Sequence, residues 1–126
     1  MLTQLVAGVG LVVGGSALAI RAAHRKPVPA DVAAQLRAAL GNPTTMAQLD
    51  AAYSQAKHPY QHQVAIASKA SRATSDGKTP ADVAALYNAA LQSGNVQTMQ
   101  SVAKQMAAKH PVLAGNLNDV AKILGG

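Results

Sequence analysis

Three histidines are the side chains of the C-terminal hundred residues whose type and spacing suggest metal binding or acid–base chemistry. They are His58, His62 and His110. His58 and His62 have the i, i+4 spacing at which two imidazoles on one helix share an ion, but Pro59 lies between them and predicts a helix boundary. The sequence contains no Cys and no Glu to complete a ligand set. We therefore expect no metal site and no cofactor.

The two Lys-His-Pro stretches can be explained by helix ends, without metal binding. Lys57-His58 and Lys109-His110 both precede a proline, where a helix is expected to end. Cations at the last turn of a helix complement its exposed carbonyl groups and the negative end of its dipole. The sequence predicts that these residues act as helix-terminal cations.

Hydroxyl side chains and glycines give no sign of catalysis. Nucleophilic catalysis needs a Ser, Thr or Lys beside a base, and no such pairing is recognisable along the chain. The phosphate-binding pattern G-x-x-x-x-G-K-[ST] is also missing from the sequence. We expect a protein that is not an enzyme.

Basic residues in the C-terminal part could contact the phosphates of a nucleic acid. The formal net charge of the chain is +6, which suits an anionic partner and also plain solubility. The sequence holds only three Tyr and no Phe or Trp, whereas single-strand binders stack bases on aromatic rings. Nucleic-acid binding by a membrane-tethered protein remains an alternative function. The basic residues that would contact the phosphates are Lys57, Lys69, Arg72, Lys78, Lys104, Lys109 and Lys122.

The opening stretch predicts a single transmembrane helix over residues 1–26, flank included. No charged residue occurs from Leu5 to Ile20, and the apolar run extends to about 20 residues, enough to cross a bilayer. Arg21, Arg25 and Lys26 then form a basic membrane flank. Because basic residues stay on the cytoplasmic side, we expect the C-terminal body in the cytoplasm or, in a virus with an internal membrane, inside the virion.

Small residues in this stretch have the spacing of packed membrane helices. Gly10 and Gly14 form a G-x-x-x-G pair, and Gly15 and Ala19 repeat the small-x-x-x-small spacing. Such faces let helix backbones approach closely, so the pattern predicts self-association of the anchor and a homo-oligomer.

Two other interpretations of the opening stretch stay open at this point. Ala17-Leu18-Ala19 resembles a signal-peptide cleavage site, although MLTQ lacks the positive start of a signal peptide. Alternatively, the apolar helix is buried among its own copies in a soluble homo-oligomer.

An internal repeat follows the anchor. Residues 29–34 and residues 80–85 both read PADVAA, and the blocks AAL, TM and AKHP recur later in the same order. The repeat predicts two related units, 27–70 and 80–126, joined by the polar linker 71–79.

Periodicity predicts an all-α body of about six short helices, in the form of two helical hairpins with an extra helix each. Each first helix is expected to begin with Pro29 or Pro80 at its first position, with Thr79 as an N-cap, and to stop at Gly41 or Gly94. Asn42 and Asn95 are expected to cap the second helices, and the third ones to cover about 59–73 and 111–124. The expected buried stripes are Val32, Leu36, Ala39, Leu40; Val83, Leu86, Tyr87, Ala90, Leu91; Met46, Leu49, Tyr53, Ala56; Met99, Val102, Met106; and Leu113, Leu117, Val120, Leu124.

Together these features predict a non-enzymatic, membrane-anchored structural or interaction protein that is a subunit of a larger assembly. Its partners would be the lipid bilayer and other protein subunits, including its own copies. A bacteriophage virion membrane or ejection component, or a bacterial inner-membrane scaffold, matches this composition.

Overall fold

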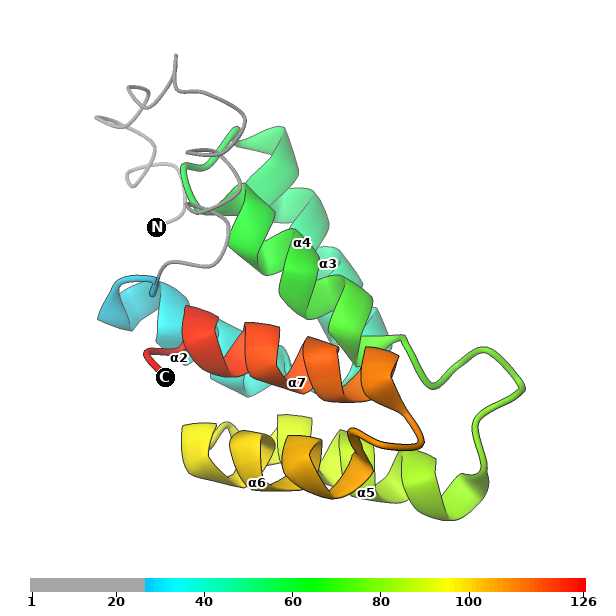
Figure 1. The fold of residues 1–126 in the computed structure, drawn as a ribbon. Coiled ribbons are helices and arrows are strands. Elements are labelled where there is room, and N and C mark those ends of the chain that lie inside the picture. The colour runs from blue at the N-terminus through cyan, green and yellow to red at the C-terminus, as the bar shows by residue number, and fades with distance from the viewer. Residues whose placement is uncertain (1–26) are drawn as a thin grey trace, which may run out of the picture.

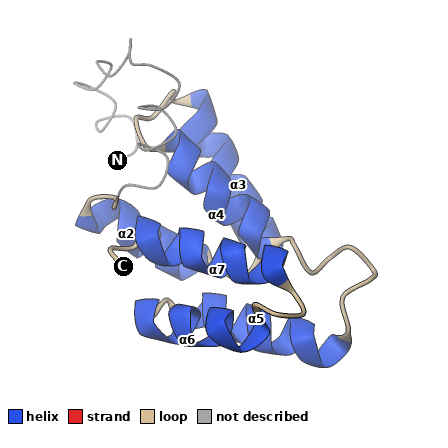
Figure 2. Cartoon of the chain, in the orientation of Figure 1, coloured by secondary structure: helices blue, strands red, loops and turns tan. Residues whose placement is uncertain are grey.

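A computed structural model describes residues 27–126, and this part of the chain is entirely helical (Figures 1 and 2). No strand occurs between residues 27 and 126, so the predicted all-α body is confirmed. The helices are α2 (Ala30–Ala39), α3 (Pro43–Gln55), α4 (Gln61–Ser71), α5 (Ala81–Ser93), α6 (Val96–Met106) and α7 (Pro111–Ile123).

The helices pack around α7. Helices α3 and α4 lie side by side as one hairpin, and α6 and α7 as another, and these two pairs make the most extensive contacts (Figure 1). Helix α7 also contacts α4 and α5, which joins the two hairpins in one hydrophobic core. The closest pairs are thus the second and third helices of each predicted unit, whereas the sequence suggested hairpins with an extra helix each.

Turn chemistry explains where α3 and α6 begin. The Asn42 side chain accepts a hydrogen bond from the Thr45 N–H at 3.0 Å, and the Asn95 side chain accepts one from the Thr98 N–H at 2.9 Å. Gly41 and Gly94 precede them with φ of +80° and +62°, a region that an L side chain rarely adopts. The predicted glycine stops and asparagine caps are confirmed.

The prolines and Thr79 differ from their predicted positions. Pro29 and Pro80 are the N-caps of α2 and α5, not first helical residues, because their extended backbone lets their carbonyls accept from Ala33 and Ala84. Thr79 does not cap α5, since its N–H and hydroxyl both donate to the Asp76 carboxylate, at 3.0 Å each. A hydrogen bond from the Lys78 N–H, together with these two from Thr79, lowers the pKa of Asp76.

The third helices come out close to their predicted ranges. Helix α7 starts at Pro111 as expected. Helix α4 starts at Gln61 instead of residue 59, because the backbone first makes a turn in which the Gln61 N–H donates to the His58 carbonyl. The loop that follows α4 leads across to α5 and includes most of the predicted linker 71–79 (Figure 1).

Two tyrosines fill the centre of a core that is otherwise lined by small and medium aliphatic side chains. Tyr53 and Tyr87 are each fully buried. The Tyr53 hydroxyl donates to the Gln35 side chain, and the Tyr87 hydroxyl to the Ala70 carbonyl, both at 2.6 Å. Burial raises the pKa of each tyrosine to about 12, with a smaller contribution at Tyr53 from the charge of Asp31. Both hydroxyls therefore stay protonated donors.

Most of the predicted buried stripes are confirmed, with one clear exception. Leu86 is 40% exposed, and its neighbour Val83 is only half-buried. The buried arc of α5 is centred on Tyr87, Ala90 and Leu91. Leu86 lies at the margin of that arc because a residue turns by about 100° relative to the one before it.

The two halves of the body pack on each other, which the sequence left open. The Arg37 guanidinium Nε donates to the Gly94 carbonyl at 2.9 Å, and the Gln92 amide donates to the Gly41 carbonyl at 3.4 Å. The Tyr87–Ala70 hydrogen bond also joins the halves. Side chains of each half thus donate hydrogen bonds to backbone carbonyls of the other half.

The start of the body is fixed to its other end. The Val28 N–H donates to the Ile123 carbonyl at 3.0 Å, so α2 begins beside the C-terminus (Figure 1). From residue 27 to residue 126, every helix is too short or too polar to cross a bilayer. The predicted membrane helix at 1–26 lies outside the described residues.

Removing the Asn95 cap should destabilise the protein measurably. Asn95→Ala leaves the first amides of α6 without their side-chain acceptor, and we expect the free energy of unfolding to fall by about 1 kcal/mol. Asn95→Asp keeps an acceptor at that position and should restore most of the loss. Urea unfolding followed by circular dichroism measures both, and equal stabilities for the two variants would contradict the cap.

Candidate functional site

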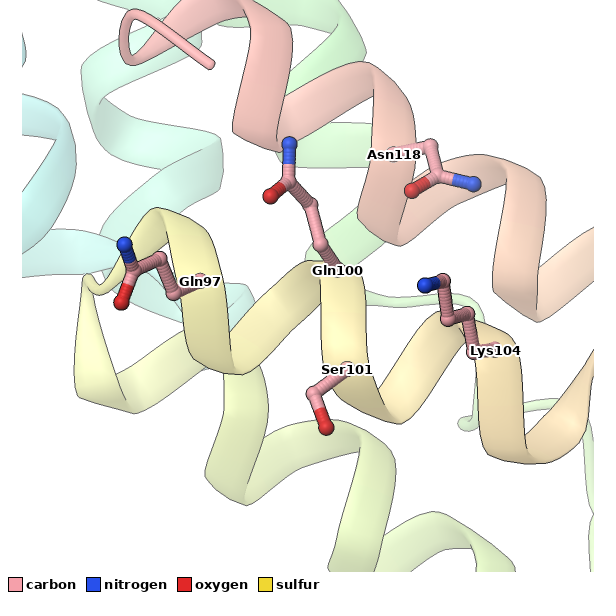
Figure 3. A pocket seen from close by; sticks show the side chains of 5 residues that line it. All are labelled: Gln97, Gln100, Ser101, Lys104 and Asn118. Carbon is pink, nitrogen blue, oxygen red and sulfur yellow. The ribbon is translucent and has the colours of Figure 1, made fainter.

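An open polar groove runs along α6 beside α7. Its volume is about 480 Å³, and its lining residues are Gln97, Gln100, Ser101 and Lys104 of α6 and Asn118 of α7. Gln100 and Lys104 extend from α6 toward α7, where Asn118 lies, whereas Ser101 points away from α7 (Figure 3). All five residues are exposed. The groove is therefore open to solvent and not an enclosed cavity.

Helical geometry brings the four groove residues of α6 onto one side. Their spacing of three, four and seven residues places them on successive turns of the same face. The opposite face, formed by Met99, Val102, Ala103 and Met106, is buried and packs in the core. Because α6 and α7 pack closely, this arrangement also holds the face next to Asn118.

The exposed face of α6 differs in composition from the exposed faces of α2 and α5. Helices α2 and α5 expose three alanines each, at 30, 34, 38 and at 81, 85, 89. Between Val96 and Met106 every exposed residue is polar, and none is acidic: Gln97, Thr98, Gln100, Ser101, Lys104 and Gln105. Ser and Thr are weaker helix formers than Ala by up to about 0.7 kcal/mol each. Helix propensity therefore does not account for the composition of this face.

The groove can bind through hydrogen bonds and one positive charge. Each Gln or Asn amide offers a carbonyl acceptor and an NH₂ donor side by side, the Ser hydroxyl does both, and the Lys104 ammonium donates three bonds. No carboxylate or imidazole is among the lining residues. Such a set has the hydrogen-bonding groups and the charge that suit a polar or anionic ligand.

The histidines are not brought together as a ligand set. His58 is buried in the turn after α3, whereas His62 is exposed on α4, so they do not share a face. His110 is the N-cap residue of α7. Within residues 27–126, no three His, Cys, Asp or Glu side chains are grouped as metal ligands.

His58 is a core residue, which corrects its predicted role as a helix-terminal cation. Its ring lies 4.3 Å from the Tyr53 ring between centroids, and its Nδ1 accepts the Tyr60 N–H at 3.0 Å. That bond assigns the proton of a neutral imidazole to Nε2, which is buried without an acceptor in the described part of the chain. Burial lowers the pKa of His58, with a smaller opposing effect of Asp31. A cation is disfavoured here.

This core position was missed because the Lys-His-Pro pattern looks the same at both sites. Lys57 adopts φ of +52°, which turns the chain and directs His58 inward against Tyr53. The nearby aromatic residues Tyr53 and Tyr60 were the available signal, since they offer a ring-lined site for an imidazole.

The other predicted site residues divide into two groups. The helix-packing residues Gly10, Gly14, Gly15 and Ala19 and the basic flank Arg21, Arg25 and Lys26 lie outside the described residues. The seven basic residues suggested for nucleic acid are all exposed but spread over the turn after α3, the end of α4, the loop before α5, helix α6, the turn after α6, and helix α7. Of these cations, Lys104 is the one that lines the groove.

Comparison with protein-family models, with curated proteins and with solved structures finds no match to this chain.

His58 should make the stability of the protein sensitive to mild acid. Because its pKa in the folded protein is below the ordinary value of 6.5, the unfolded chain binds the proton more tightly. The stabilising effect is complete above pH 6.5 and is lost as the pH falls through and below that value. Urea unfolding at pH 7.5 and pH 5.0 should therefore give a lower free energy of unfolding at pH 5.0.

Two variants separate His58 from the other histidines. His58→Phe keeps a ring against Tyr53 but cannot bind a proton, so the difference between pH 7.5 and pH 5.0 should shrink. Loss of the Nδ1 acceptor should cost the variant about 1 kcal/mol at neutral pH. His62→Gln, at an exposed position, should keep the wild-type pH dependence; a wild-type pH dependence in His58→Phe would show that another group is responsible.

Proposed function

We propose that the chain is a non-enzymatic, membrane-anchored subunit of a larger assembly, with residues 1–26 as a transmembrane helix and residues 27–126 as its interaction module. The observation that carries this proposal is the direct junction between the two parts. Pro27 alone separates the basic flank, which ends at Lys26, from Val28, whose N–H is bonded to the end of α7. In this proposal one residue separates the basic flank from the fixed start of the body.

The junction would fix the body at the membrane surface. Val28 is half-buried against the core, and its hydrogen bond to Ile123 orients the chain at the corner where α2 begins and α7 ends. A helix inserted in lipid with its basic flank at the headgroups would place this corner within a few residues of the bilayer. The body would then stand in a defined orientation on the cytoplasmic or virion-interior side, as a scaffold subunit requires.

We also propose that 27–70 and 80–126 are two related units. The proposal is supported by the repeated PADVAA and AKHP blocks and by the equivalent caps, Asn42 to Thr45 and Asn95 to Thr98. Two similar units on one anchor would offer similar surfaces to neighbouring subunits. A virion component of a bacterial virus, internal to its membrane or ejected with its genome, suits this composition, and a bacterial inner-membrane scaffold suits it equally.

Alkaline extraction of membranes from cells that express the full chain tests the anchor. We expect the protein to stay with the lipid, because a helix embedded in hydrocarbon is held by the hydrophobic effect and not by charge. Intact mass of the recovered protein should include Met1. Release of the full-length protein would instead favour a soluble homo-oligomer, and a mass that begins at Ile20 would show a cleaved signal peptide.

Substitution in the small-residue pair tests self-association. Gly14→Leu places a bulky side chain where Gly10 and Gly14 would let two helices meet, so the protein in non-ionic detergent should shift toward monomer. Sedimentation equilibrium measures the shift. Val12→Leu, between the two glycines and on the other side of the helix, should leave the association unchanged; an equal shift in both variants would contradict the predicted interface.

A further inference from the structure

We propose that the exposed face of α6 binds duplex DNA by entering its major groove. The face consists of the six polar residues defined above, from Gln97 to Gln105, and the polar groove beside α7 forms one edge of it. This activity is separate from the proposed membrane-anchored assembly, since it depends on α6 and not on residues 1–26.

The residue types on this face are those that read base edges. Asn and Gln amides pair with the N6 and N7 of adenine, Lys with the O6 and N7 of guanine, and Ser or Thr with several bases. The exposed face of α6 holds three Gln, one Thr, one Ser and one Lys, and no other residue type. Apart from Thr98, whose hydroxyl donates to Asn95 Oδ1, these side chains are therefore of the types that contact base edges or phosphates.

The charges around the face favour a polyanion. Between Val96 and Met106 no acidic residue occurs, so none opposes phosphates at this face. Exposed Lys109 lies three residues after Met106, the last residue of α6, and exposed Lys122 lies one helical turn beyond Asn118 on α7. In this proposal Lys104, Lys109 and Lys122 supply the phosphate contacts. Asp119 on α7 is half-buried and engaged in other interactions.

The shape of the site favours a duplex over a single strand and over RNA. Single strands are bound largely by stacking on aromatic rings, and α6 contains no aromatic residue. An α-helix with its side chains is about 10–12 Å across, which fits the B-form major groove of about 12 Å, whereas the major groove of A-form RNA is too narrow for it. The buried side of α6, held by α7, keeps the helix rigid as it enters.

Binding of labelled duplexes by the full chain in non-ionic detergent tests this inference. Fluorescence anisotropy at 50–200 mM salt should show binding of a 24-base-pair mixed-sequence DNA that weakens by about 40-fold over this range, for about three phosphate contacts. An RNA duplex of the same sequence, with the same phosphate charge, should bind at least tenfold more weakly. No binding to DNA at 50 mM salt, or equal binding to both duplexes, would overturn the proposal.

Exposed-residue variants locate the site without disturbing the core. Lys104→Gln should lower the slope of log affinity against log salt by about 0.9, the value of one lost contact, whereas Lys57→Gln, the same charge loss at the turn after α3, should leave it unchanged. Gln100→Ala should keep the slope but alter the bases enriched from a randomised duplex pool.

Three outcomes would contradict sequence-reading DNA binding by α6. Equal effects of Lys104→Gln and Lys57→Gln would show diffuse attraction by net charge. An unchanged base preference in Gln100→Ala would show that α6 does not read bases. Binding of a polyglutamate peptide as tightly as DNA would show a general anion surface and overturn the assignment to DNA.

Discussion

The scarcity of large side chains is the constraint on which the structure of the body depends. The chain has no Phe or Trp, and its core is closed by alanine, valine, leucine and methionine around Tyr53 and Tyr87. A core of small residues buries little area per contact, so helices must approach closely. Each buried tyrosine adds area but brings a hydroxyl that needs an acceptor. Gln35 and the Ala70 carbonyl supply these acceptors, and the second bond links α5 to α4.

Tertiary hydrogen bonds make the two halves one body. Arg37 and Gln92 reach across to the carbonyls of Gly94 and Gly41, at the points where each first helix has ended. Those carbonyls lie in tight turns and have no intrahelical partner, so a side chain from the other half satisfies them. Close packing of α7 against α4 completes the contact. The predicted duplication therefore does not produce two independent modules.

Polar chemistry in the body is divided between a buried position and an exposed one. His58 lies inside the turn after α3, with its ring tilted against that of Tyr53, and burial without an acceptor for Nε2 lowers its pKa and disfavours the charged form. The exposed face of α6 gathers amides, hydroxyls and Lys104 where α2 and α5 expose alanine. The first feature underlies the predicted acid sensitivity of stability, and the second is the surface that we propose as a contact site.

Local chemistry allowed much of the helical layout to be predicted from the sequence. Glycines, asparagine caps and apolar periodicity are short-range signals. They predicted where α2 and α5 end, where α3 and α6 begin, and most of the buried stripes. The predicted starts of α2, α4 and α5 were wrong by one or two residues, because the backbone of the preceding turns makes other hydrogen bonds. The polar residues of the groove were visible in the sequence, but Lys104 was the one singled out.

Long-range packing decided the rest. Which helices pair, that the halves share a core, that Leu86 is exposed and that His58 is buried all depend on contacts between residues far apart in the chain. Likewise, Asn118 joins four residues of α6 in one groove because α7 packs along α6. The sequence by itself determined that this body is a set of short helices, two of which begin at an asparagine cap. Only the tertiary structure decided which of their faces meet and which remain on the surface, because burial is a property of neighbours and not of local propensity.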